Sequence, residues 1–214
     1  MATIKVVQLL KRAQQLAVDE TEINWDLPEW LSCFNEAVIT VANARADSTA
    51  ATVTHSTDEG SKQIIPSDGI RFLTLTRNLG SGYPIRKVER RQLDDRMIPW
   101  HNKSGDEVNH FVHDPIEPKV FYIYPQPAAG HEVELVYQRT PNQITISNFD
   151  SDTQVLPMDD VYYNALLYFT LSRAYMKDAD YIESSNLSAH YEARGYNAIG
   201  VKSKSDGGAI NESK

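Results

Sequence analysis

The 214-residue chain has only one cysteine, Cys33, so no disulfide can form within it and packing must hold the fold together. Cys33 falls in an apolar helical pattern, which predicts a small core residue. No stretch reaches the ~18 apolar residues of a membrane span, and the N-terminus enters an amphipathic pattern without a signal peptide. We therefore expect a soluble protein with no membrane partner, not exported by the usual route.

The chain as a whole is also not basic. The formal net charge is −8, which argues against general nucleic-acid binding. The segment 71–103 is an exception, because it carries eight basic residues against three acidic ones. The eight are Arg71, Arg77, Arg86, Lys87, Arg90, Arg91, Arg96 and Lys103. Such asymmetry suits contact between copies, basic surface against acidic surface, although a solvated face with no partner is the alternative.

Motifs for phosphate binding and nucleophilic catalysis are absent. Gly80-Ser81-Gly82 lacks the other glycines and the Lys-Ser/Thr of a P-loop, and no Gly-x-Ser-x-Gly marks a nucleophile elbow. His110 and His113 are the best metal candidates. In a strand, residues three apart point to opposite faces, so these two imidazoles cannot share an ion. We expect no cofactor and no metal site.

Neighbouring acids are the remaining candidates for catalysis, since glycoside hydrolysis needs two carboxyls across a cleft. The groups are Asp94 with Asp95, Asp159 with Asp160, and Asp178 with Asp180 and Glu183. Acids adjacent in sequence at helix starts are better explained by capping and by the helix dipole. Trp100 could stack on a ligand, but an aromatic anchor in a core or a subunit interface is the favoured interpretation. We therefore do not expect an enzyme.

Amphipathic helices are expected near the N-terminus. Apolar residues recur at helical spacing over residues 3–18, with Thr3 as a candidate N-cap. A second helix begins at Asp26 and runs to about residue 44. Asp26 and Glu29 resemble a capping box, and Pro28 occupies the first turn, where its missing N–H costs nothing.

Two more helices are expected near the C-terminus. Asp159 or Asp160 caps a long helix that ends at about residue 176, and a last helix covers 181–198. The inner face of the long helix is predicted to carry Val161, Ala165, Leu166, Phe169 and Arg173 or Ala174. Residues 200–214 have almost nothing to bury, so on its own this tail should be disordered.

The middle of the chain favours β-structure. Residues 49–55 and 62–65 read as a β-hairpin around the turn 58–60. Residues 70–76 are ambiguous between a short helix and an extended segment. A short strand at 85–88 and a brief helix at 89–96 follow. Further strands at 108–113, 120–124 and 132–137 should form a small antiparallel sheet, the last alternating with Val133, Leu135 and Tyr137 on one side.

These patterns predict an α+β fold. Residues 1–47 and 155–199 would form an α-helical bundle, residues 48–154 an inserted, β-rich subdomain, and residues 200–214 a flexible C-terminal tail.

The order of several segments resembles that of phage adaptor proteins. The segments are Pro99-Trp100, FYIYPQP at 121–127, GHEVELVY at 130–137, LPMDDVY at 156–162, LSRAYMKDA at 171–179, AHY at 189–191, and the first helix with LSCFNEA at 31–37. Together they extend from about residue 5 to residue 198, and none is a catalytic signature.

This resemblance implies a head-to-tail connector similar to the tail tubular protein A type of short-tailed phages. Such subunits form a dodecameric ring that joins the portal protein to the tail nozzle or tail tube and continues the DNA channel, without sequence-specific DNA binding. The protein would be a virion component assembled in the host cytoplasm. In that family the helical part docks at the portal, often through an extended C-terminal segment, and the β part faces the nozzle.

Two sets of residues are expected to make contacts. The tail would bind the portal through Val201, Lys202, Lys204, Ile210 and Lys214. The interface between subunits would use Trp100, Arg86, Arg90, Arg91 and Arg96.

Two other functions remain open at the level of sequence. An adaptor-associated peptidoglycan hydrolase would need two acids facing one another across a groove. A regulatory or scaffolding factor would leave the strands rich in Tyr and Pro, and the terminal tail, without a clear purpose.

Overall fold

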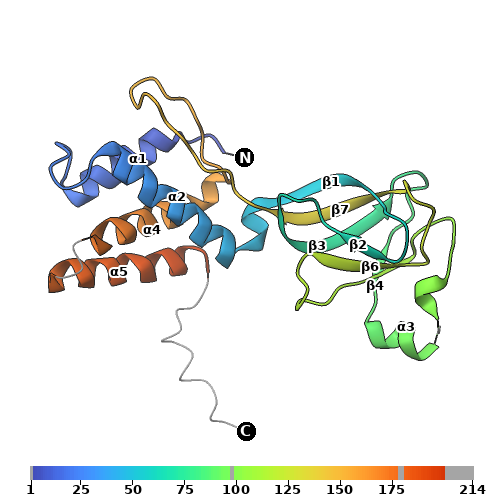
Figure 1. The fold of residues 1–214 in the computed structure, drawn as a ribbon. Coiled ribbons are helices and arrows are strands. Elements are labelled where there is room, and N and C mark those ends of the chain that lie inside the picture. Colours follow the sequence, from blue (N-terminus) through green and yellow to red (C-terminus); the bar gives the residue numbers. More distant parts are fainter. Residues whose placement is uncertain (1, 97–98, 178–180, 201–214) are drawn as a thin grey trace, which may run out of the picture. The chain divides into compact units, whose positions relative to one another are not determined.

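The computed structural model describes residues 2–96, 99–177 and 181–200. The chain divides into two compact units (Figure 1). The helical unit runs from Met1 to Ser48 and again from Pro141 onward, and the β unit runs from Thr49 to Thr140. The mixed α+β class and the insertion of strands between helices are confirmed.

In the described part of the helical unit there are four α-helices: α1 (Val6–Ala17), α2 (Leu27–Ala44), α4 (Tyr163–Met176) and α5 (Ile182–Ala198). Helix α4 packs against the other three and therefore buries residues around most of its circumference. Helix α5 can approach α4 closely because Gly195 faces Phe169, where a Cβ atom would lie 2.7 Å from the ring. Of the predicted inner face, Ala165, Leu166, Phe169 and Ala174 are buried, whereas Val161 is 77% exposed.

The caps of these helices agree with the sequence in one case only. Asp26 accepts a hydrogen bond from the Glu29 N–H at 2.8 Å, and the Glu29 carboxylate accepts from the Asp26 N–H at 3.3 Å, which confirms the capping box. Thr3 is not an N-cap, since α1 begins after Lys5. Thr3 instead donates its hydroxyl to Asp160 at 2.6 Å, so this carboxylate ties the N-terminus to the short turn η3 (Asp160–Tyr162) and does not cap α4.

The described residues of the β unit form two sheets. In the first the order is β1 (Ala50–Ser56), β7 (Glu132–Arg139), β3 (Gly69–Asn78), all antiparallel. In the second it is β2 (Lys62–Ile64), β6 (Val120–Tyr124), β5 (His110–Val112), β4 (Arg86–Lys87), with β4 and β5 parallel. The inward side chains of both sheets share one core, in which Phe72 stacks on Phe121 at 4.6 Å between ring centroids.

The expected hairpin of 49–55 with 62–65 is wrong, because β1 pairs with β7 and β2 pairs with β6. The connection crosses from one sheet to the other around the fully buried Gln63. Its amide donates to the carbonyls of Asp58 and Gly60, both at 2.9 Å, and its carbonyl accepts from the Asp58 N–H at 2.8 Å. One side chain thus supplies the hydrogen bonds that a strand partner would supply in a hairpin.

Two other sequence expectations change in this unit. The ambiguous segment 70–76 belongs to the long strand β3. The three later strands do not form one sheet, since β7 leaves β5 and β6 to pair between β1 and β3. The alternation in β7 is confirmed, with Val133, Leu135 and Tyr137 each at most 1% exposed. The short helix is α3 (Arg90–Arg96), as expected.

The two units separate after Thr140, earlier than the boundary after residue 154 that the sequence suggested. The irregular loop that follows packs Ile144, Ile146 and Phe149 against the helical core. Asn35 of α2 also binds this loop, because its side chain donates to the Ile144 carbonyl at 3.0 Å and accepts from the Ile144 N–H at 2.9 Å.

Candidate assembly surfaces

Several of the acids weighed for chemistry, and one of the two histidines, have structural partners. Asp94 accepts from the indole N–H of Trp100 at 2.7 Å, and Asp95 lies 3.4 Å from Arg91. His113 lies 2.9 Å from the Val120 carbonyl. Among the described residues no group of three or more His, Cys, Asp or Glu could hold a metal ion. Asp178 and Asp180 lie outside the described residues.

An exposed basic strip runs along β4 and α3; we define it as Arg86, Lys87, Arg90 and Arg91. Arg90 lies 3.5 Å from Asp94 and 5.8 Å from the centre of the Tyr122 ring. Within the described chain, neither Arg86 nor Lys87 has an ion-pair partner. Arg96 is the last residue of α3. Four of the residues expected at a subunit interface therefore come from adjacent elements of the β unit.

Trp100 occupies a core instead of the surface. It is 3% exposed, stacks on His101 at 3.6 Å between ring centroids, and packs with Leu93 and Val112. Of the two positions that the sequence left open, the single chain places this side chain in a core. Trp100 fixes α3, and with it part of the basic strip, to the sheet.

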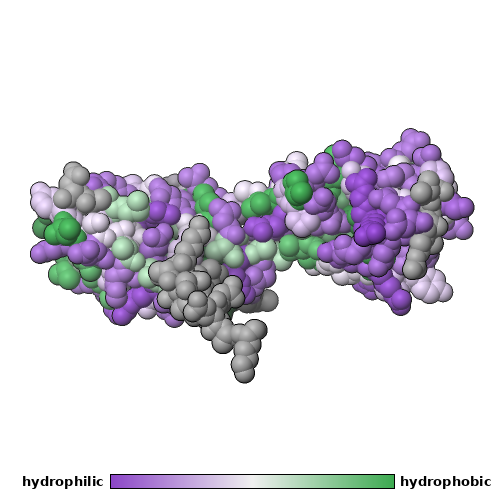
Figure 2. Space-filling view, turned by 90° about the horizontal axis from the view of Figure 1, so that it is seen from below, coloured by the Kyte–Doolittle hydropathy of each residue, from purple (hydrophilic) through white to green (hydrophobic). Residues whose placement is uncertain are grey.

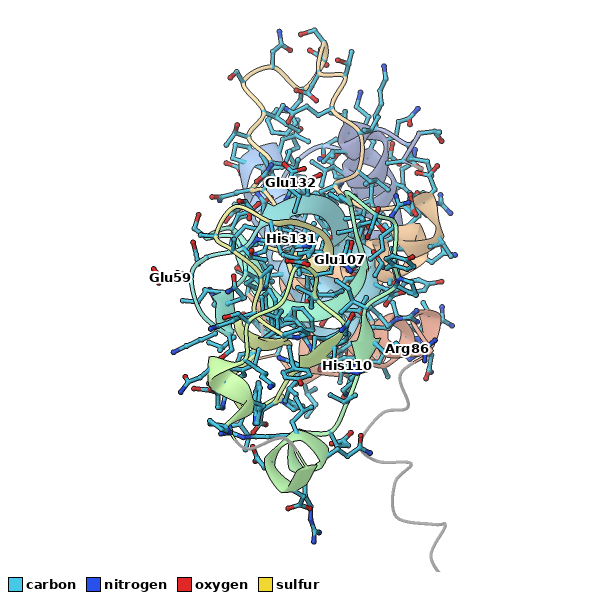
Figure 3. All side chains as sticks on the ribbon, turned by 90° about the vertical axis from the view of Figure 1, so that its right-hand side faces the viewer. Glu59, Arg86, Glu107, His110, His131 and Glu132 are labelled. Carbon is cyan, nitrogen blue, oxygen red and sulfur yellow. The ribbon has the colours of Figure 1, made fainter. Side chains whose placement is uncertain are left out.

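A hollow of about 480 Å³ adjoins the basic strip. Its lining residues are Tyr83, Pro84, Arg86, Glu107, Asn109 and His110. Figure 3 labels three of them, Arg86, Glu107 and His110, which come from β4, the loop before β5, and β5. The Nδ1 atom of His110 is buried and has no hydrogen-bond partner. The exposed Arg86 guanidinium at the rim of this hollow suits an acidic group of another chain.

A cluster of exposed apolar side chains marks one end of the helical unit, and sequence reasoning missed it. We define this apolar end by Val18, Ile23, Met176, Tyr181 and Ile182, which are between 50% and 88% exposed. They come from the α1–α2 connection, the end of α4 and the start of α5, and Figure 2 shows apolar patches at this end. Several large apolar side chains exposed at one end of a unit commonly mark an interaction site.

The connection that carries Val18 and Ile23 is held in shape by polar groups. The Asp19 carboxylate is 2% exposed and accepts hydrogen bonds from the backbone N–H groups of Ile23, Asn24 and Trp25. Val18 adopts a left-handed backbone conformation with φ of 56°, which is unfavourable for a β-branched residue. Such local strain is retained when the surroundings impose it and is enriched at functional sites.

A polar junction fixes the opposite end of α5. Arg45 donates to both carboxylate oxygens of Asp47, at 2.8 and 2.7 Å, and to the Ile199 carbonyl at 2.8 Å. Tyr162 donates its hydroxyl to the same Asp47 carboxylate at 2.8 Å. The hydrogen bonds from Arg45, followed by the one from Tyr162, hold the pKa of Asp47 well below its ordinary value. The expected portal-binding residues Val201, Lys202, Lys204, Ile210 and Lys214 follow this junction in sequence and lie outside the described residues.

These surfaces define an α+β protein with an inserted β unit and exposed apolar and basic regions suited to protein contacts. The family model of the SU10 adaptor protein matches residues 4–211, nearly the whole chain. The chain therefore belongs to the SU10 adaptor protein family, a family of structural phage proteins. A comparison with curated proteins gives no match. In the described part of the chain no helix is long and apolar enough to cross a membrane.

Proposed function

We propose that this chain is a head-to-tail adaptor of the virion, one subunit of a dodecameric ring that joins the portal to the tail nozzle or tail tube. The family match over residues 4–211 carries the proposal. The ring would continue the DNA channel, and a net charge of −8 suits a conduit through which DNA slides without sequence-specific binding. Assembly would take place in the host cytoplasm.

Charge supports contact between copies. The helical unit carries 17 acidic and 10 basic residues, whereas the β unit carries 12 acidic and 11 basic residues. The basic strip is therefore a local exception on a nearly neutral unit, and the acidic surface that it would meet belongs to the helical unit of a neighbour. Such complementarity speeds association and selects the partner more than it adds affinity.

The tail is the element proposed to bind the portal. Residues 200–214 follow α5, whose end is fixed by the bond from Arg45 to the Ile199 carbonyl. A segment that orders on docking lowers its entropy at that moment, so binding can be specific without being tight. Val201 and Ile210 would be its apolar anchors.

Light scattering of portal rings mixed with the protein tests this function. The full chain should add to the ring with dodecameric stoichiometry, and deletion of 200–214 should abolish joining while circular dichroism stays helical. A full-length Val201→Ser, Ile210→Ser variant should weaken joining, and Ile39→Ser, at an exposed position on α2, should not. Retained joining after the deletion would contradict the docking role, and a wild-type chain that binds no portal would contradict the adaptor function.

A further inference from the structure

Strand β1 is a sheet edge without the usual protection. Its seven residues, AATVTHS, pair with β7 on one side and with no other strand of the described chain. They include no proline, no glycine and no Asp, Glu, Lys or Arg. Natural proteins normally block open edges with charges, prolines, bulges or very short strands, because an open edge pairs with other chains.

The other sheet edges are blocked. Strand β2 has three residues and begins with Lys62, and β4 has only two, Arg86 and Lys87. The free side of β3 is covered by other backbone groups. The Phe72 N–H donates to the Pro118 carbonyl at 2.7 Å, and the Thr76 carbonyl accepts from the Ile85 N–H at 2.9 Å. Only β1 combines length with an open side in the described structure.

The register identifies the open backbone groups. The Thr57 N–H donates to the His131 carbonyl at 2.8 Å, so Thr57 faces β7. In an antiparallel pair alternate residues face the partner, so the other odd-numbered residues of β1 do the same. Ala50, Thr52, Thr54 and Ser56 then direct their N–H and C=O groups to the open side. All four have exposed, short side chains that allow another backbone to come close.

Hydrogen-bonding capacity is also unused around this strand. Among the described residues, three buried side-chain polar atoms on β1 or next to it have no hydrogen-bond partner. These are Thr49 Oγ1, His55 Nε2 and Thr57 Oγ1. Most buried polar groups in native proteins are paired, so these three atoms are unusual, but they are buried and a chain docked on the open edge would not reach them.

We propose that β1 is a docking edge for β1 of a second copy, in a two-fold antiparallel pair centred on Val53. This register places Thr52 opposite Thr54 of the partner and Ala50 opposite Ser56, so all the open backbone groups meet. The edge carries no formal charge, so a two-fold axis there brings no like charges together. The same operation at β4 would place Arg86 opposite Lys87 of the copy, and at β2 it would place the two Lys62 side chains diagonal to each other.

A two-fold contact is closed and ends at two copies, so it cannot by itself build a ring. The β1 pair is therefore a state of the free protein, distinct from the ring and portal contacts proposed above. Because the contact is a single strand pair without an apolar core, we expect a weak dimer that is populated only at high concentration.

Cross-linking tests the register. In a Cys33→Ser background, Thr52→Cys chains mixed with Thr54→Cys chains should form disulfide-linked dimers under mild oxidation. Each variant alone should form far fewer, because position 52 is diagonal to position 52 of the partner. Ser81→Cys, at an exposed position of the same unit, is the control for random collision. Equal cross-linking in all samples, or none in the mixture, would overturn the proposal.

Sedimentation equilibrium from micromolar to millimolar protein gives a second readout. The mass should rise toward that of a dimer, and Thr54→Pro should abolish the rise, since it removes an outward N–H that the β1–β7 ladder does not use. Thr145→Pro, outside β1, is the control and should leave the rise unchanged. Circular dichroism checks that both variants fold. Thr54→Pro should still join portal rings, so a failed dimer and a failed adaptor give different results. A constant monomer mass, or an undiminished dimer in Thr54→Pro, would refute β1 pairing.

Discussion

The helical unit and the β unit solve the problem of a buried core in different ways. The helical unit surrounds α4 with aliphatic and aromatic side chains. The close approach of α4 to α5 depends on the absence of a side chain at Gly195. The β unit ties its strands and turns together through amide side chains, and two of these, Gln63 and Asn78, are fully buried. Apolar packing tolerates small shifts, whereas a buried amide must keep all of its partners.

The largest effect should come from the helical core. Phe169→Ala removes a ring that is 1% exposed and contacts Gly195, so we expect a loss of about 3–5 kcal/mol in the free energy of unfolding. Trp25 and Trp30 lie in the helical unit and Trp100 lies in the β unit. Variants that keep the tryptophans of one unit only therefore report the unfolding of that unit by fluorescence in a denaturant titration. The transition seen by Trp25 and Trp30 should move and that of Trp100 should not. A common shift would mean that the two units unfold as one.

A smaller effect is expected from Asn78 in the β unit. Its amide donates to the carbonyls of Val108 and Tyr83, and its carbonyl accepts from the Val108 N–H and the His131 ring. Asn78→Ala leaves these groups unpaired, so the β unit should lose about 2–4 kcal/mol. The Trp100 transition measures the loss, and the exposed Asn109→Ala is the matched control. Equal stabilities of the two variants would show that the amide is not essential.

The smallest effect should be the acid sensitivity of the helical junction. Arg45 and Tyr162 hold the pKa of Asp47 below its ordinary value. The stabilisation is therefore fully present above that ordinary value, and it decreases as the pH falls from there toward the lowered, folded-state pKa. Melting temperatures between about pH 6 and pH 3 should fall less steeply in Asp47→Asn than in the wild type. Asp150→Asn, on an exposed loop, is the control; parallel curves for all three proteins would exclude Asp47 as a source of the slope.

Helix positions followed from local signals in the sequence. The Asp26–Glu29 capping box and the apolar spacing of α1, α2, α4 and α5 act within a few residues, so they can be recognised without knowing the fold. Strand partners could not be recognised in this way. The segment 58–60 has the composition of a hairpin turn, but the hydrogen bonds of Gln63 send the chain to another sheet.

Of the two candidate surfaces, one could be predicted from the sequence and the other could not. The basic segment was visible as composition, and four of its residues do form an exposed strip on β4 and α3. The apolar end was not visible, because Val18 and Ile23 continue the pattern of residues that are buried elsewhere. Their exposure depends on Asp19, which turns the backbone by accepting three N–H groups.

The sequence by itself determined the helices, the lack of a disulfide within the chain, the uneven charge and the membership of an adaptor family. These features depend on composition, on local pattern or on the order of segments along the chain. Tertiary structure alone decided which strands pair, that Trp100 supports the basic strip from within a core, and that β1 has an open edge. The physical reason is that burial and strand pairing depend on residues far apart in the chain, such as Ala51 and Tyr137, whose meeting no local pattern encodes.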